Sequence, residues 1–297
     1  MRDRFIVVDV KGYRRKEKKE IITDYIIPRL EKSYAANKVS ITMDEPAIEY
    51  LLKTYTKSFG VRDAEKAMQR ICSNKLLDQA GSDDPWKVRI DKNDVKKYLG
   101  KEPIPRGNFP NKVVPGISKA LAVSNGNMGL TFAIETVLLE GNEGIEITGL
   151  PKEMAIDSVK ICVTCMKKMY PNILKGKSIH VHFGEGSVPK DGPSVGTALF
   201  LSILSAAVNK PVTTGDQYDL AFTGEIGLTG SVFAVGGVLE KLQAASDSGC
   251  IKVFIPMQNY ERLDQNTIND FDFEVIGVSH VSEIVEIVYP DFKETDL

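Results

Sequence analysis

Ser194 is the residue of this chain that is best placed to act as a nucleophile. It lies in residues 184–196, a polar run punctuated by Gly and Pro that leads directly into the apolar stretch 198–208. A serine at the start of a helix has unpaired backbone N–H groups beside it and the positive end of the helix dipole behind it. Both can stabilise an oxyanion. The pattern therefore predicts attack on a carbonyl by Ser194, provided that a base activates the hydroxyl.

Few side chains can serve as that base, because the chain has only three histidines, His180, His182 and His280. His180 and His182 alternate in residues 178–183, which is typical of a strand with both imidazoles on one face. This pair precedes the serine loop instead of facing it. The order along the chain therefore favours a structural role for both.

Lys241 is the other candidate base. It follows a Gly-Gly pair in the first turns of a helix expected at 237–248, and its neighbours are mostly apolar. Burial lowers the pKa of a lysine by up to about 3–5 units, and nearby positive helix ends act in the same direction. The neutral amine then takes the proton of the Ser194 hydroxyl and later donates it to the leaving amine. The residues alone leave a second interpretation open, a solvated Lys241 paired with Glu240 or Asp247.

Three segments resemble, in order, the three signature segments of the Lon protease domain. They are residues 189–196 (Pro-Lys-Asp-Gly-Pro-Ser-Val-Gly), 222–230 (Phe-Thr-Gly-Glu-Ile-Gly-Leu-Thr-Gly) and 236–245 (Gly-Gly-Val-Leu-Glu-Lys-Leu-Gln-Ala-Ala). In that family the serine of the first segment is the nucleophile and the lysine of the third is its general base. The resemblance therefore implies a dyad of Ser194 and Lys241, with no third catalytic residue required. Asp191, three residues before Ser194, is a candidate gating residue or an ordinary aspartate in an Asx-turn, and Thr223 is a further candidate gating or supporting residue.

The resemblance continues into the first third of the chain. Residues 3–13 and 58–65 are similar to the start and the sensor-2 segment of the small ATPase subdomain of Lon. In such ATPases the arginine matched by Arg62 reaches toward nucleotide phosphates held by the neighbouring large subdomain. From the residues alone, Arg62 is better explained as a surface arginine that caps a helix start.

A P-loop is absent from the sequence, because the Gly-Lys-Ser at 176–178 has Pro171 where the first glycine is required. We therefore expect no cofactor and no metal in this chain, and ATP and Mg only in a full-length protein. The chain is expected to be an excised piece that lacks the large ATPase subdomain.

Two segments depart from the family pattern. Residues 125–140 stand where the family has a Trp and a Gly-Gly pair, whereas the only Trp of this chain is Trp86. Residues 213–219 form a stretch a few residues longer than usual, which predicts an extended turn. The first departure affects the substrate groove, and neither changes the predicted dyad.

Two other classes of function remain open. Residues 192–196 also fit the Gly-x-Ser-x-Gly nucleophile elbow of α/β-hydrolases, which would make the chain an esterase using Ser194 and His280. A buried strand should lead directly into such an elbow, whereas a polar loop precedes Ser194. The other class is a non-catalytic adaptor fragment, in which the helical half binds a partner and Ser194 only caps a helix.

Composition limits the compartment and the partners. The net charge of −2 does not indicate a nucleic-acid binder, and four cysteines are too few for a disulfide scaffold in 297 residues. Cys162 and Cys165 lie in a helical pattern without a second pair of ligands, which argues against zinc. The longest apolar run falls short of the about 18 residues of a membrane span. We expect a cytoplasmic protein in a bacterium, or a protein of the mitochondrial matrix in a eukaryote.

The elements that must position these residues fall into two domains. Residues 1–102 have helical periodicity and are expected to form a small helical bundle, which the resemblance equates with the small ATPase subdomain. Residues 103–114 are a Pro/Gly-rich linker, and residues 115–297 are expected to form an α/β (α+β) protease domain. Helices are expected at 16–35, 46–55, 62–77, after Asp91, and at 154–169, 195–208, 237–248 and 281–288. Strands are expected at 136–139, 145–148, 179–183, 220–223, 253–255 and 273–278.

Residues and resemblance together predict a serine endopeptidase with a Ser-Lys dyad, the proteolytic part of an ATP-dependent Lon-type protease. The resemblance implies unfolded or misfolded proteins as substrates, a role in protein quality control, and a homo-oligomeric, hexameric ring. Neither a membrane nor a nucleic acid is an expected partner.

Overall fold

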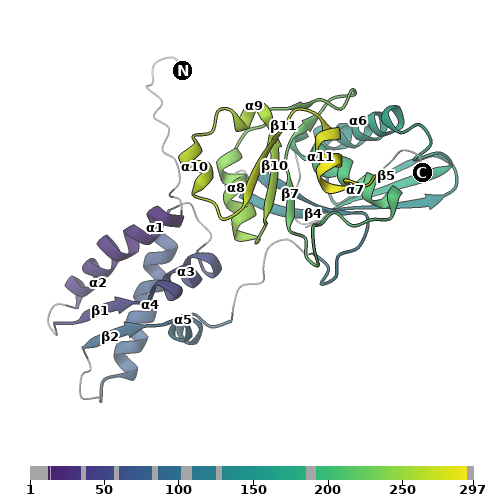
Figure 1. Ribbon diagram of the computed structural model, residues 1–297. Helices are drawn as coiled ribbons and strands as arrows, with labels where there is room; N and C mark the ends of the chain where they lie inside the picture. The colour runs from purple at the N-terminus through teal and green to yellow at the C-terminus, as the bar shows by residue number, and fades with distance from the viewer. Residues whose placement is uncertain are drawn as a thin grey trace, which may run out of the picture. The chain divides into compact units, whose positions relative to one another are not determined.

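The computed structural model describes residues 13, 15–34, 38–56, 60–81, 86–101, 109–124, 129–184 and 192–292. The chain divides into two compact units, residues 1–104 and 105–297. Each unit is described by itself below (Figure 1).

The first unit contains the four expected helical regions and, in addition, a small sheet. Its elements are α1 (Arg15–Ile21), the π-helical η2 (Ile22–Ile26), α2 (Ile27–Ser33), β1 (Ser40–Met43), α3 (Glu45–Thr54), α4 (Arg62–Asp78), β2 (Lys87–Ile90) and α5 (Lys92–Leu99). Strands β1 and β2 pair in parallel, so a two-stranded sheet is present beside the helices of the expected small bundle. Side chains of a strand point alternately to its two faces. One face of each short strand is therefore buried, with Ile41, Val88 and Ile90 in the same core as the helices.

The second unit is built on a seven-stranded mixed sheet in the order β11-β10-β7-β3-β4-β6-β5. The strands are β3 (Ile117–Val123), β4 (Gly129–Glu140), β5 (Ile145–Thr148), β6 (Lys177–Phe183), β7 (Leu220–Phe222), β10 (Lys252–Pro256) and β11 (Glu274–Val278). Strand β4 is antiparallel to β3 and β6, whereas β3, β7, β10 and β11 run parallel to one another. A small antiparallel hairpin, β8 (Glu225–Ile226) and β9 (Val232–Phe233), follows β7.

Helices cover the two faces of this sheet (Figure 1). Helices α6 (Glu153–Met169), α7 (Gly196–Val208) and α11 (Val281–Val288) share one core, and α8 (Val238–Asp247) belongs to another. Ala120 belongs to the first core and Leu121 to the second, because consecutive residues of a strand point to opposite faces. The short helices α9 (Met257–Tyr260) and α10 (Gln265–Asn269) follow β10.

The mixed α/β class is confirmed, and each helix and strand expected in the second half is present. Strand β3 was not expected, because Lys119 interrupts its apolar pattern, although that lysine is only 4% exposed. The short elements β8, β9, α9 and α10 also gave no periodic signal. Within the described ranges, no helix has the length and apolar character that crossing a bilayer requires.

Candidate active site

Ser194 lies where the sequence predicts it, immediately before a buried helix. It is the middle residue of a 3-10 turn, η4 (Pro193–Val195), that continues into α7. A Cβ added to Gly196 would lie 2.8 Å from the backbone nitrogen of Ile226. Glycine at 196 therefore allows the first turn of α7 to pack directly against strand β8.

The segment after β7 fixes the backbone of Ser194. The Ser194 carbonyl accepts hydrogen bonds from the Gly224 N–H at 2.9 Å and from the Thr223 hydroxyl at 3.2 Å. In return, the Thr197 N–H donates to the Gly224 carbonyl at 3.1 Å. Thr223 is fully buried, so its hydroxyl supports the serine through the main chain.

Lys241 is buried on the sheet side of α8. Only 2% of it is exposed, although it lies one turn from the helix start at Gly237, which has the left-handed φ of 65°. Burial lowers the pKa of Lys241 to about 8, and the smaller effect of Glu240 acts in the opposite direction. The interpretation of Lys241 as a solvated helix lysine is therefore wrong.

Both residues of the predicted dyad lie toward the same end of the sheet. Strands β3 and β7 are parallel, with Ala120 opposite Phe222, so the Thr223 segment that binds Ser194 lies at their carboxyl ends. Helix α8 starts at this end as well, because a Cβ on Gly237 would lie 2.5 Å from the Val123 side chain.

The dyad itself is not closed by a hydrogen bond. Among the described residues, none joins the Ser194 hydroxyl to the Lys241 ammonium. Catalytic hydrogen bonds are often long without a bound substrate, so the pairing stays a prediction that the shared location supports. Asp191, the predicted gating residue, lies outside the described residues.

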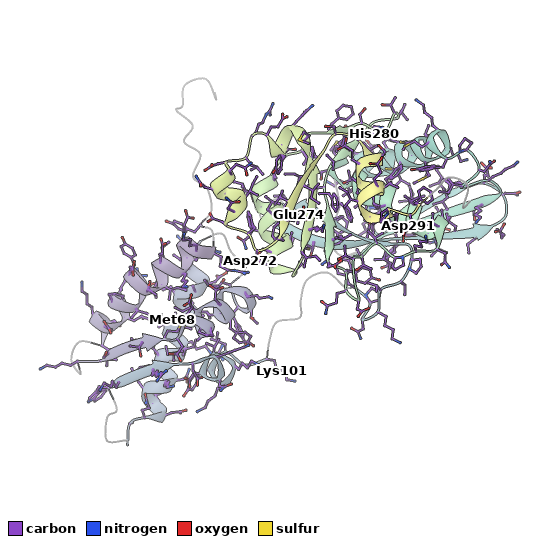
Figure 2. The ribbon with its side chains drawn as sticks, in the orientation of Figure 1. Met68, Lys101, Asp272, Glu274, His280 and Asp291 are labelled. Atoms are coloured by element: carbon purple, nitrogen blue, oxygen red, sulfur yellow. The ribbon has the colours of Figure 1, made fainter. Side chains whose placement is uncertain are left out.

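The ring nitrogens of His280, the base of the esterase alternative, make structural hydrogen bonds. It is the N-cap of α11 (Figure 2). Its Nδ1 accepts from the Ser282 N–H at 3.2 Å, and its Nε2 lies 2.9 Å from the Thr229 carbonyl oxygen. A carbonyl can only accept, so Nε2 carries the proton. Nδ1 thus caps α11 and Nε2 binds the β8–β9 hairpin, which argues against His280 as a base for Ser194.

The histidines of β6 and the cysteines of α6 lie in structural surroundings, and the Cys162 thiol donates to the Gly196 carbonyl at 3.4 Å, at the start of α7. His180 and His182 do share one face of β6, and the Thr148 hydroxyl bridges their rings at 3.0 and 2.8 Å. Cys162 and Cys165 are buried free thiols of α6. Across the described ranges, no group of three or more His, Cys, Asp or Glu is arranged to hold a metal.

Two further features are independent of the predicted dyad. Arg62 is exposed at the first residue of α4, in the first unit. A groove of about 670 Å³ lies between α6 and the edge strand β5, and its lining includes Ile145, Ile156 and Lys160 but none of the predicted site residues.

Two residues near α8 were missed in the sequence. A Cβ on Gly129, at the start of β4, would lie 1.8 Å from the Glu240 carbonyl oxygen, and an isolated glycine in a strand pattern is a signal for such a close approach. Asn259 binds the main chain of Val235 with its side-chain amide. No local pattern predicts this contact, because it joins residues far apart in the chain.

Comparison with known proteins agrees with the resemblance. The family model described as the Lon protease (S16) C-terminal proteolytic domain matches residues 89–290. The Lon protease of Clostridioides difficile (strain 630) is 33% identical over 291 residues, 96% of this chain and 36% of that protein. The Lon protease of Fervidobacterium nodosum is 34% identical over 264 residues, which cover 87% of this chain and 32% of that protein. The mitochondrial Lon protease homolog of Caenorhabditis briggsae is 30% identical over 335 residues, which cover 97% of this chain and 34% of that protein.

The fold and these matches define a mixed α/β domain of the Lon proteolytic type. The chain belongs to the Lon protease family. It spans about a third of the length of the curated relatives that it matches.

Proposed function

We propose that this chain is a serine endopeptidase with Ser194 as nucleophile and Lys241 as general base, the proteolytic part of an ATP-dependent Lon-type protease. The observation that carries the proposal is the burial of Lys241 at the end of the sheet where Ser194 is bound. A lysine whose pKa is lowered to about 8 is partly neutral at physiological pH, so it can accept a proton.

In this mechanism the Lys241 amine takes the proton of the Ser194 hydroxyl as the oxygen attacks the peptide carbonyl. Backbone N–H groups at the start of α7 stabilise the oxyanion. The Lys241 ammonium then protonates the leaving amine, and an acyl ester remains on Ser194. Water, activated by the neutral amine, hydrolyses this ester and restores the enzyme.

The wider assignment follows from the family. Unfolded or misfolded proteins are the proposed substrates, in protein quality control, and a homo-oligomeric, hexameric ring is the proposed assembly. Nucleotide and Mg would be bound by the full-length protein, where Arg62 would approach the phosphates. The bacterial and mitochondrial relatives support the bacterial cytoplasm or the mitochondrial matrix as the compartment.

The test is cleavage of an unstructured polypeptide by this chain without ATP, for the wild type and the variants Ser194→Ala and Lys241→Ala. Each variant should lose cleavage by a factor of about 10³ or more, because each removes half of one catalytic unit. Circular dichroism should show that both variants are folded. The wild-type rate should rise with pH between about 6 and 9 as the lysine loses its proton. Full activity in folded Lys241→Ala would refute the mechanism.

A further inference from the structure

The side-chain amide of Asn259, on α9, binds both main-chain groups of one residue in the connection before α8. The Val235 N–H donates to Asn259 Oδ1 at 2.8 Å, and Asn259 Nδ2 donates to the Val235 carbonyl at 3.0 Å. Only one orientation of the amide satisfies both groups. Asn259 thus makes with Val235 the pair of main-chain hydrogen bonds that a neighbouring strand would make.

Val235 is the last residue before the Gly-Gly pair that leads into α8, the helix that carries Lys241. The connection from β9 to α8 consists of residues 234–237, and Gly236 and Gly237 are its second half. Two glycines restrict the backbone least of all residue pairs. The direction in which α8 starts therefore depends on how firmly Val235 is held.

Helix α9 holds Val235 from the end of the sheet where the predicted dyad lies. It follows β10, which is parallel to β7, and the Thr223 N–H donates to the Phe254 carbonyl of β10 at 3.0 Å. Asn259 therefore lies on the short helix that directly follows β10, the strand bonded to the segment that supports Ser194.

The first turn of α8 packs so closely against the start of β4 that little displacement is possible. The main chain of Glu240 lies against Gly129, where an added Cβ would be 1.8 Å from the Glu240 oxygen. The next residue, Lys241, is only 2% exposed in this arrangement. A shift of about 1 Å at a catalytic group can cost about 100-fold in rate.

We propose that Asn259 is a positioning residue for Lys241: by clamping Val235 it fixes the start of α8 and keeps the lysine seated on the sheet. The inference rests on the proposed function only in giving Lys241 the role of base. The seating of Lys241 is a physical property that can be measured without cleavage.

The experiment compares the wild type with Asn259→Asp and Asn259→Ala. Aspartate keeps the shape and the acceptor but turns a second oxygen toward the Val235 carbonyl, and alanine removes both bonds. The matched control is Asn266→Asp, on α10, whose side chain is exposed. Thermal unfolding establishes that each variant is folded.

The first readout is the pKa of Lys241, obtained from competitive acylation of lysines at several pH values followed by mass spectrometry. Both Asn259 variants should raise this pKa from about 8 toward the ordinary 10.5, because a loosened α8 admits water. The second readout is peptide cleavage, where kcat should fall by about 10-fold or more with KM nearly unchanged. The acid limb of the pH–rate profile should move to higher pH.

The outcomes separate the two proposals. An unchanged Lys241 pKa in a folded Asn259 variant overturns the inference, whatever the activity does. Cleavage retained in Lys241→Ala overturns the proposed mechanism, and the acylation data still decide whether Asn259 seats the lysine. Hydrogen exchange of the wild type adds a test without any variant, because the Val235 amide should be protected and fast exchange would contradict the clamp.

Discussion

The Gly224 N–H donates a hydrogen bond to the Ser194 carbonyl at 2.9 Å. This bond joins the loop that carries the predicted nucleophile to the end of β7. A Cβ on Gly224 would lie 2.7 Å from the Val232 side chain and 2.9 Å from that of Thr197. The position of Ser194 thus depends on close packing of the β8–β9 hairpin against the first turn of α7.

Lys241 should make the stability of the fold rise with pH between about 8 and 10.5. Its pKa is about 8 in the folded state against an ordinary value of 10.5, so the unfolded state binds more protons in this window, and the free energy of unfolding increases with pH. At 1.36 kcal/mol per pH unit the effect is at most about 3 kcal/mol. Lys241→Met should therefore be more stable than the wild type near pH 7.

Urea denaturation at pH 7 and pH 10 measures this difference. Lys252→Met is the control, because Lys252 is partly exposed in an ion pair with Glu274 at 3.0 Å. The same pH dependence in the wild type and in Lys241→Met would contradict the burial of an ammonium at 241.

Gly129→Ala should displace the first turn of α8 and lower kcat/KM by about 100-fold, since a Cβ at 129 collides with the Glu240 main chain. Gly144→Ala is the matched control, because its nearest neighbour would be the Asn142 oxygen at 3.9 Å. Steady-state cleavage of a short peptide measures both. Equal activity of the two folded variants would show that the close packing of α8 against Gly129 is not needed for cleavage.

His280→Asn should leave labelling of Ser194 by a covalent serine probe in place, because His280 serves the hairpin and α11. Its Nε2 bonds the Thr229 carbonyl at 2.9 Å, and loss of that bond should lower the unfolding temperature. Mass spectrometry of the labelled peptide measures the first effect and calorimetry the second. Complete loss of labelling in a folded variant would restore the esterase alternative.

Asp191→Asn should raise basal cleavage of a short peptide. A carboxylate three residues before Ser194 can pair with the Lys241 ammonium or accept from the serine hydroxyl, and either contact holds the dyad in an unproductive arrangement. The alternative is an Asx-turn within the loop, for which activity would stay constant or fall. Initial rates of wild type and variant decide between them, and the second outcome would remove Asp191 from a regulatory role.

Sequence alone determined those features that depend on residues close together in the chain. Apolar periodicity gave α6, α7 and α11, and the position of Ser194 at the start of α7 followed from a polar loop meeting an apolar run. The pairing of Ser194 with Lys241 is a prediction that rests on the resemblance of three short segments. A periodic pattern depends only on neighbouring residues, so it predicts these helices without knowledge of the fold.

Tertiary structure decided everything that depends on contacts between distant segments. Strand β3 with its buried Lys119, the desolvation of Lys241, the engagement of His280 with Thr229, and the clamp of Asn259 on Val235 all join residues far apart in sequence. The burial of Lys241 is the clearest case, because the same helix sequence with its lysine in water would keep an ordinary pKa. Desolvation is a property of what packs against a side chain, and only the folded sheet supplies that neighbour.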